Sequence, residues 1–439
     1  MPRGAPGDSD RRHSPGILAD FPRLDPPARP CHCAPLRAPL KGLPVDAPSR
    51  PHARLRPEMD ALEESKIVEV WQLGLGRQDL IRLWVGESDV VTPPFIRQAA
   101  AAALEAGHTF YSYKRGEPEL RETLAAYINR LHGTPARPRP VASDRITVTS
   151  AGMNGLMLVM ECLIEAGDEL VAVTPVWPNI FAAARILGGV PKPVTLDLTD
   201  RGWSLDLDKL FAACGPRTKA MFVNSPGNPS GWMLTEAQQR AILEFCRRRG
   251  IWLIADEVYD RFVYDRAVAP SFLSIAEPDD DLIVVNSFSK AWAMTGWRMG
   301  WLVTSHRFGE VIGKTVEFNT SGTPPFLQHA GVVAVRDGEP FVKEMVERCR
   351  VGRDLVHQAL SASPRVRMVR PEASIYAFFK VDGVTDTVQF CKDILTRAGV
   401  GLAPGEAFGP GGESCVRLCF ATSAPKLSEA MERLMPMLR

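Results

Sequence analysis

Between residues 144 and 287 the sequence alternates short, β-branched apolar runs with stretches that have helical spacing. The apolar runs are RITVTS, DELVAVT, TKAMFVNS, IWLIAD and DLIVVNS, and the clearest helical stretches are AGMNGLMLVMECLIEAG and TEAQQRAILEFCRRRG. Strands that are apolar on both faces must be covered on both faces, and the helices between them supply that cover. The pattern therefore predicts an α/β fold with a mostly parallel central sheet, whose active site lies beyond the carboxyl ends of the strands.

The rest of the chain differs from this region in composition and pattern. Residues 1–57 are rich in proline and arginine and lack apolar periodicity, so we expect a disordered extension. Residues 58–91 have a short helical pattern and a short strand, and we expect them to pack with the small domain. The large domain is expected at 92–330. Long helical stretches around short strands then predict a smaller α+β C-terminal domain at 331–439.

Two interpretations of the Pro-rich extension remain open: a tail without a function of its own, and a docking arm. Its prolines argue against an amphipathic mitochondrial presequence, and it has no continuous apolar run like that of a secretory signal.

Overall composition excludes several classes of protein. The formal net charge is +1, which provides no bulk electrostatic reason to bind nucleic acid or a membrane surface. No apolar run approaches the roughly 18 residues of a membrane-spanning helix. The nine cysteines are scattered without the spacing of a zinc site, so we expect no metal and a reducing, cytoplasmic environment.

Polar side chains follow two of the predicted strands at the point where each strand ends. In NSPGNPSG the prolines and glycines open the backbone, and Asn228 projects an amide. In ADEVYDRF, Asp256 and Tyr259 are three residues apart and can face one crevice. A buried carboxylate needs a cationic or hydrogen-bonding partner, and a protonated ring nitrogen is one such partner. The alternative interpretation is a surface turn with a solvated Asp256.

The segment NSFSKAWAMTGWRMGW, residues 286–301, brings a lysine to the end of a further strand. In an apolar pocket beside other cations the charged form of Lys290 is disfavoured, so its amine can act as a nucleophile. Ser287 and Arg298 carry the groups that a bound phosphate needs. Taken alone, Lys290 could equally be a solvated loop lysine.

Two other strand ends are less specific. VTSAGMNG turns from a strand into a helix, whose N-terminal N–H groups could bind an anion such as a phosphate. In TPVWPN, Trp177 lies just past a strand and could stack on a planar ring. The alternative interpretations are an ordinary strand–helix turn and a core tryptophan.

Together these segments resemble the fold-type I pyridoxal-phosphate (PLP) enzymes, specifically the class I and II aminotransferases related to aspartate aminotransferase, over about residues 55–439. SFSKAWAMTGWRMGW is similar to the family motif S-x-S-K…G-x-R-x-G, NSPGNPSG to N-x-P-x-N-P-[ST]-G, and ADEVY to D-E-x-Y. Asp256 follows Asn228 by 28 residues, a spacing similar to that of the family. The resemblance implies a seven-stranded, mostly parallel sheet with helices on both faces, in a large domain that binds PLP.

The resemblance also implies a role for each residue at the strand ends. Lys290 would form the internal aldimine with PLP and, once released, act as the general base. Asp256 would keep the pyridine nitrogen protonated. Tyr259 and Asn228 would form hydrogen bonds to the ring oxygen O3′. The remaining cofactor contacts would be stacking by Trp177 and phosphate binding by Ser287, Arg298 and the backbone of Gly152 and Met153.

Three further motifs carry the resemblance to the substrate and the partner subunit. YSYKRGEPELRE is similar to the family's Y-x-x-x-x-G-x-P-E-L-R-E, which implies a homodimer in which Tyr111 reaches the phosphate of the other subunit. GESD resembles the family's GEPD turn, which implies that Gly86 lies near the substrate together with Trp177 and Asn228. VRLCFA resembles V-R-[IL]-x-[FY]-A, so Arg417 would hold the substrate α-carboxylate through a two-pronged contact.

The chain departs from the family pattern at three positions. Ala151 stands where glycine is common in the phosphate turn. Ile180 stands where one subgroup of aspartate aminotransferases has a histidine behind the ring, and Phe318 aligns roughly with that subgroup's arginine for a distal carboxylate. Specificity for dicarboxylates by that route is therefore not supported, although other subgroups bind dicarboxylates differently.

The reaction implied by the family is a ping-pong transamination between an L-amino acid and a 2-oxo acid. Arg417 would hold the carboxylate so that the Cα–H bond, rather than the bond to the carboxylate, is broken. The main alternative is a β- or γ-eliminating lyase on the same fold, using the same residues. A non-catalytic regulator would need an N-terminal helix-turn-helix, which the Pro-rich 1–57 cannot form. The sequence predicts neither the amino donor nor the acceptor.

Overall fold

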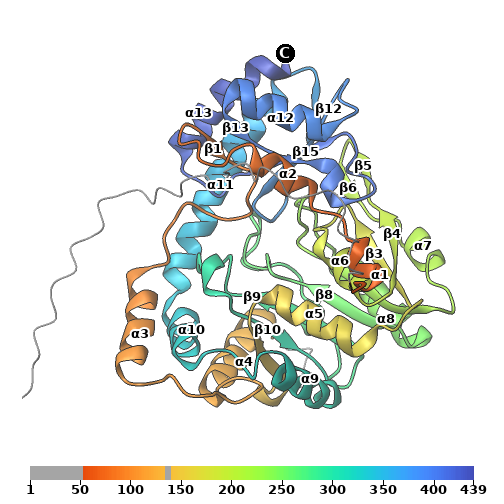
Figure 1. Ribbon diagram of the computed structural model, residues 1–439, viewed down its shortest axis with the longest axis vertical. Coiled ribbons are helices and arrows are strands. Elements are labelled where there is room, and N and C mark those ends of the chain that lie inside the picture. Colours follow the sequence, from red (N-terminus) through yellow and green to blue (C-terminus); the bar gives the residue numbers. More distant parts are fainter. Residues whose placement is uncertain (1–52, 134–139) are drawn as a thin grey trace, which may run out of the picture. The chain divides into compact units, whose positions relative to one another are not determined.

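A seven-stranded sheet with the strand order β2-β10-β9-β8-β7-β3-β4 is the centre of the unit Leu55–Arg439 (Figure 1). The computed structural model describes residues 53–133 and 140–439, so the predicted extension 1–57 lies outside the described residues except for its last part. In this sheet β10 runs antiparallel to both of its neighbours, and the other pairs are parallel. The strands are β2 Ile146–Thr149, β3 Glu169–Thr174, β4 Val190–Thr195, β7 Thr218–Asn224, β8 Trp252–Asp256, β9 Leu282–Ser287 and β10 Gly300–Val303. The mostly parallel sheet predicted from the sequence is confirmed.

Two of these strands have no counterpart among the apolar runs of the sequence. β4 reads VPKPVT and forms one edge of the sheet. The N–H of Val190 donates to Asp168 O (2.8 Å), so Pro191 and Pro193, at the alternate positions, face away from β3 and lack only N–H groups that the ladder does not use. β10 is a four-residue strand that begins only two residues after Arg298, whose φ of 54° turns the chain back.

Helices cover both faces of the sheet, as the alternating pattern requires. In β9, Leu282 and Val284 belong to one buried cluster, and Ile283 and Val285 belong to another on the opposite face. The first cluster includes residues of α4, α8 and α10, and the second includes residues of α5, α6 and α9. These helices are α4 Pro118–His132, α8 Glu236–Arg249, α10 Pro325–Asp337, α5 Gly152–Leu163, α6 Asn179–Ile186 and α9 His306–Asn319.

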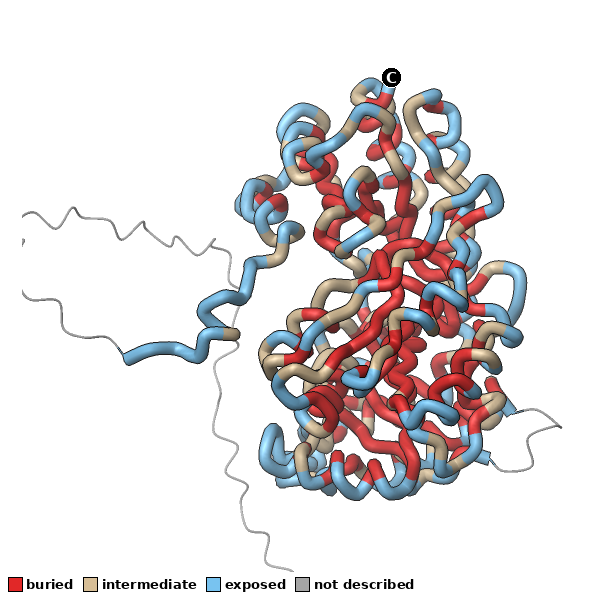
Figure 2. Tube along the Cα trace, turned by 90° about the vertical axis from the view of Figure 1, so that its right-hand side faces the viewer, coloured by how far each residue is buried: buried red, intermediate tan, exposed pale blue. Residues whose placement is uncertain are grey.

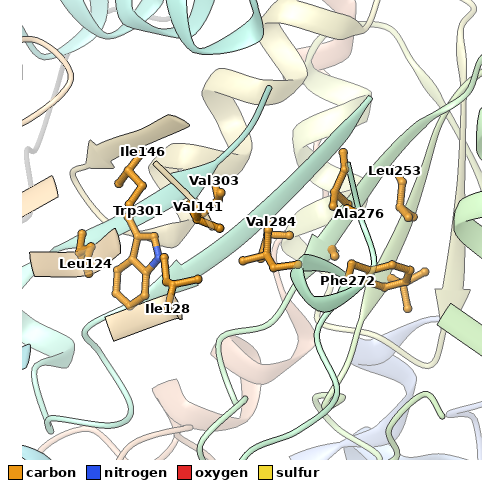
Figure 3. Packing of buried hydrophobic residues seen from close by; sticks show 14 of the residues in the cluster. Leu124, Ile128, Val141, Ile146, Leu253, Phe272, Ala276, Val284, Trp301 and Val303 are labelled. Carbon is orange, nitrogen blue, oxygen red and sulfur yellow. The ribbon is translucent and has the colours of Figure 1, made fainter. Parts of the chain in front are cut away.

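The sheet interior is closely packed on the α4 side. Figure 3 shows Trp301 of β10 beside Leu124 and Ile128 of α4, with Val284 of β9 next along the sheet. Figure 2 shows the buried residues as a continuous inner layer below the exposed loops and helix surfaces. Such a core fixes the strand ends, and therefore the side chains that follow them, in position.

A second, four-stranded antiparallel sheet with the order β11-β12-β15-β14 is formed by the C-terminal part of the chain. Its strands are β11 Val366–Arg367, β12 Tyr376–Val381, β14 Ala403–Pro404 and β15 Cys415–Cys419. Helices α11 Glu339–Ser361, α12 Thr387–Ala398 and α13 Ala424–Leu434 contribute residues to the same hydrophobic cluster as these strands. This is the smaller α+β arrangement that the sequence predicts.

The N-terminal part of the described chain is attached to this C-terminal sheet region. β1 Ile81–Arg82 pairs in parallel with β13 Val400–Gly401, and Val70 of α2 Lys66–Gln72 is fully buried in the C-terminal cluster (Figure 1). The remaining elements are α1 Pro57–Asp60, α3 Pro94–Glu105, α7 Leu207–Ala212, β5 Asp197–Thr199, β6 Gly202–Ser204 and the short 3-10 helices η1 Ser143–Arg145, η2 Phe272–Ser274, η3 Thr295–Trp297, η4 Gly405–Phe408 and η5 Met435–Leu438. None of the helices in residues 53–133 and 140–439 combines the length and the apolar character that a membrane-spanning helix requires.

The contact between β13 and the buried Trp84 yields a stability prediction. A Cβ atom added at Gly401 would overlap the Trp84 ring, so we expect Gly401→Ala to destabilise the protein by about 1–3 kcal/mol through overpacking. Gly215→Ala is the matched control, because the nearest atom to its Cβ is Glu169 Oε2 at 3.7 Å. Thermal unfolding followed by circular dichroism should show a lower Tm for Gly401→Ala only. Equal Tm values for both variants would contradict the packing described.

Candidate active site

A cavity of about 620 Å³ opens beyond the carboxyl ends of β7, β8 and β9. Its wall contains every site residue predicted from the sequence except Tyr111: Gly86, Gly152, Met153, Trp177, Asn228, Asp256, Tyr259, Ser287, Lys290, Arg298 and Arg417. Parallel strands bring their carboxyl ends to one edge of the sheet, which is why residues from 152 to 298 meet there. Arg417 arrives from β15 of the second sheet, and Gly86 from the loop after β1.

Asp256 is the last residue of β8 and is 6% exposed. One carboxylate oxygen, Oδ1, accepts a hydrogen bond from the N–H of Val258 (3.2 Å). Within the described parts of the chain, Asp256 forms no ion pair. Burial raises the pKa of Asp256 to about 6, since a hydrogen bond from Val258 and the charge of Lys290 offset only part of the desolvation. The Asp256 carboxylate can therefore accept a hydrogen bond from a buried cationic donor, whose charge would balance its own.

Tyr259 is buried near Asp256, and its hydroxyl lies 2.6 Å from the hydroxyl of Tyr376. The two rings meet edge to face with centroids 5.6 Å apart. Burial raises the pKa of Tyr259 well above its ordinary value, which keeps the phenol protonated. Tyr376 also explains why position 86 is a glycine, because a Cβ atom at Gly86 would overlap the Tyr376 hydroxyl.

Tyr376 was missed by the sequence analysis. It lies in β12, where Phe378 pairs with Arg417, and Tyr376 therefore lies on the same face of the sheet as Arg417. The sequence does show a polar aromatic residue within the apolar run SIYAFF. However, the strand register that brings Tyr376 to the cavity depends on pairing with a strand that is distant in the sequence.

Lys290 follows β9 and is partly buried. Its Nζ donates to Gly86 O and lies 5.8 Å from the centre of the Tyr259 ring. Burial lowers the pKa of Lys290 to about 8, and the positive charges of Arg417 and Arg298 act in the same direction. A substantial fraction of the amine is therefore neutral near physiological pH, which a nucleophile or a general base requires.

An anion cradle lies at the start of α5. Gly152 begins this 12-residue helix directly after Ala151, which has a φ of 96°, and Gly152 and Met153 line the cavity, so the N-terminus of the helix borders it. The Ser287 hydroxyl lies 2.9 Å from that of Ser289, a second cavity residue that the sequence analysis did not identify. At the start of β10, a Cβ on Gly300 would come within 2.6 Å of Gly152 N, so glycine is required for this close approach.

Arg298 lies at the rim of the same cradle, and its Nη1 donates to Thr295 O (2.7 Å). The Arg298 side chain is exposed and borders the same cavity as Gly152 and Met153, so its guanidinium would lose little hydration on contact with an anion there. These donors together fit a phosphate group.

Arg417 is 3% exposed and is the second buried charge of the cavity. Its Nη1 donates to Asn228 Oδ1 (3.0 Å) and its Nη2 donates to Trp84 O, while its Nε has no hydrogen-bond partner. The guanidinium carbon lies 4.5 Å from the centre of the Tyr376 ring. Among the described residues no carboxylate pairs with Arg417. A buried guanidinium without a counter-ion fits the carboxylate of a ligand.

Asn228 and Trp177 both border the cavity as expected. The side-chain oxygen of Asn228 already accepts from Arg417, so its Nδ2 amide is the group that remains to donate to a ligand. Trp177 is half-buried in the loop between β3 and α6, and Ile180 of α6 is fully buried in the hydrophobic cluster on that face of the sheet.

Tyr111 does not reach the cavity of its own chain. Its side chain is 93% exposed, and Phe318, at the position aligned with a distal-carboxylate arginine, is 89% exposed on α9. Neither residue is part of the cavity wall.

The chain matches the family model described as "Aminotransferase class I and II" over residues 78–434. It is 31% identical to the aspartate aminotransferase of Pyrococcus horikoshii over 377 residues, which cover 85% of this chain and 94% of that protein. It is 33% identical to an arginine–pyruvate transaminase of Pseudomonas aeruginosa over 361 residues, covering 81% and 89%. The solved structure of Thermus thermophilus aspartate aminotransferase with maleate superposes with a TM-score of 0.81 at 31% identity, covering 88% of this chain and 100% of that one. The likeness extends over sequence motifs, sheet and strand-end cavity alike, and this chain belongs to the class I and II aminotransferases.

Proposed function

We propose that Asp256, Tyr259 and Lys290 are the catalytic residues of this aminotransferase, in a cavity that holds PLP, the cofactor of its family. The observation that carries the proposal is the pairing of two unusual groups in one cavity. Asp256 is a buried carboxylate without an ion pair, and Lys290 is an amine whose pKa is lowered to about 8. Neither arrangement stabilises the fold by itself, and both are typical of an active site.

The residues present fit PLP at each of its polar groups. A protonated ring nitrogen would supply the cation that the buried Asp256 carboxylate lacks, and Lys290 would hold the cofactor covalently. The Tyr259 hydroxyl and the Asn228 Nδ2 amide would donate to the ring oxygen. The other contacts would be stacking by Trp177 and phosphate binding by Ser287, Arg298 and the backbone of Gly152 and Met153.

Bound PLP supplies an electron sink for the charge that develops on Cα of the amino acid. Arg417 would bind the α-carboxylate through two of its nitrogens, and this contact would turn the Cα–H bond towards Lys290. The neutral amine of Lys290 would take this proton and later return it at a neighbouring atom. Because the carboxylate is held by Arg417, its bond to Cα would not be the one broken. The amino group would then pass to a 2-oxo acid in the reverse half-reaction.

We also propose that the protein is a cytoplasmic homodimer. Ser112 Oγ donates to Thr323 O (2.9 Å) and Lys114 pairs with Glu317 (3.0 Å), so the segment of Tyr111 lies beside the last turn of α9 and the segment that follows it. The exposed aromatic side chains here, including Tyr111, form a surface that is unusual for a monomer. In a dimer, Tyr111 would reach the phosphate site of the partner.

The first prediction concerns Lys290. We expect the purified holoenzyme to be yellow and to change its absorption when an amino acid is added, and we expect Lys290→Ala to lower turnover by at least about 10³-fold. Lys314→Ala, at an exposed lysine of α9, is the control and should keep normal turnover. Normal turnover by Lys290→Ala would contradict the assignment. Release of pyruvate and ammonia without an oxo acid would instead indicate a lyase.

The second prediction concerns Asp256 after PLP has been removed. The folded-state pKa of about 6 is higher than the ordinary value of about 3.9, so the charged carboxylate destabilises the fold above pH 6. We expect Asp256→Asn apoprotein to have a Tm about 2–5 °C above that of the wild type at pH 7.5, and no advantage near pH 4. Differential scanning fluorimetry at both pH values measures the difference. A lower Tm for Asp256→Asn at pH 7.5 would show that the carboxylate is not destabilising.

The third prediction concerns Tyr111. Sedimentation equilibrium should give twice the chain mass, and Tyr111→Phe should weaken PLP binding by about tenfold, because one hydrogen bond to a charged phosphate is lost. Tyr113→Phe is the matched control in the same exposed segment. A monomer that binds PLP fully, or equal PLP affinity for both variants, would contradict the dimer proposal.

A further inference from the structure

Part of the cavity wall has no role in the site as proposed above. Once the residues for PLP and for the α-carboxylate are set aside, a cluster of apolar side chains remains: Ile67, Val68 and Trp71 of α2, and Val85 beside Gly86. We call these four residues the apolar wall. Trp71 is 41% exposed and Val85 is 39% exposed, so these two side chains are not consumed by the protein core, whereas Ile67 is partly buried and also packs against the C-terminal cluster.

The orientation of α2 explains why its apolar face is turned to the cavity. On a helix, Ile67, Val68 and Trp71 fall within about 100° of one another. The opposite face is held by the C-terminal part of the chain, where Lys66 pairs with Glu406 (2.7 Å) and Val70 is fully buried. Val70 and Ile67 already attach this short helix to the C-terminal cluster, so Val68 and Trp71 are not needed to hold it in place.

Two further contacts anchor α2, one at its N-terminus and one near its middle. Ser65 caps the helix by accepting from the N–H of Ile67 (3.3 Å), and Lys392 of α12 pairs with Glu69. The helix is therefore positioned by groups that point away from the cavity, and its apolar wall is left to contact a ligand.

The charges of the cavity are already assigned. The charged side chains in its described wall are Asp256, Lys290, Arg298 and Arg417. These match the ring nitrogen, the amino group, the phosphate and the α-carboxylate, and the described cavity wall offers no further cation of this chain for a second carboxylate. Placing a carboxylate against the apolar wall would cost several kcal/mol, whereas an apolar side chain gains about 25 cal/mol for each Å² that it buries there.

We infer that the amino donor is an amino acid with an apolar side chain, aliphatic or aromatic, and that Ile67, Val68 and Trp71 are the residues that select it. This inference rests on the proposed function, because it uses the proposed positions of the cofactor and the α-carboxylate. It adds the class of substrate, which the sequence motifs leave open.

The test measures the first half-reaction of the holoenzyme by its absorption change, because this step needs no acceptor. We expect second-order rate constants for L-leucine and L-phenylalanine that exceed that for L-aspartate by at least about tenfold, since one or two buried methylene groups already give this ratio. A higher rate constant for L-aspartate would overturn the inference and leave the aminotransferase assignment intact. If no amino acid reacts, L-alanine included, the proposed function itself fails.

Variants of α2 test whether this helix selects the side chain of the substrate. We expect Trp71→Ala to lower the rate constant for L-phenylalanine by about tenfold and that for L-alanine, whose methyl group offers little apolar surface to the wall, by less than about twofold. Leu75→Ala, at an exposed residue outside the cavity wall, is the matched control and should change neither. Equal losses for both amino acids in Trp71→Ala would show a general structural role and overturn the assignment to this residue.

A binding measurement avoids the reaction altogether. 3-Phenylpropanoate and succinate carry a carboxylate for Arg417 but no amino group, and their Kd values for the holoenzyme can be measured by calorimetry. We expect 3-phenylpropanoate to bind at least about tenfold more tightly, with most of this difference lost in Trp71→Ala. Tighter binding of succinate by the wild-type protein would overturn the inference.

Discussion

The burial of opposite charges that do not pair with each other is the constraint on which this structure depends. Asp256 and Arg417 are both nearly inaccessible, and within the described residues neither has an ion-pair partner. Isolated charges of this kind cost several kcal/mol each, and only a well-packed fold can hold them. The two apolar layers on either side of the central sheet provide that support, since they fix the strand ends from which Asp256 and Lys290 project.

The site is assembled from parts of the chain that are far apart in sequence. Arg417 of β15 contacts Asn228, which follows β7, and also the backbone of Trp84, which follows β1. Tyr376 of β12 contacts Tyr259, which follows β8. Any relative movement of the two sheets would therefore change the surroundings of Arg417 and of the Tyr259 hydroxyl together. With Arg417 in its proposed role, this coupling would link substrate binding to the geometry of the residues that would face the cofactor.

The sequence was most informative where a function needs several residue types within one short segment. Lys290 with Ser287 and Arg298, and Asp256 with Tyr259, lie in local motifs at strand ends, and the predicted sheet places them in one cavity. Tyr376 could not be predicted, because its position depends on the pairing of β12 with β15. The strand β4 was also missed, since its prolines suit only an edge, and edges are not visible in the sequence.

The separation of α2 from the strand ends has a consequence for how such enzymes diversify. The groups that would carry the chemistry are anchored in the sheets, whereas Ile67, Val68 and Trp71 of the apolar wall lie on a seven-residue helix held from its other side by Val70 and by Lys66. Substitutions at Val68 or Trp71 can therefore accumulate under selection without disturbing the sheet edge. After a gene duplication, one copy of the enzyme could acquire a new substrate through a few substitutions in this helix. The relatives of this chain include proteins named for aspartate, for arginine and for aromatic amino acids.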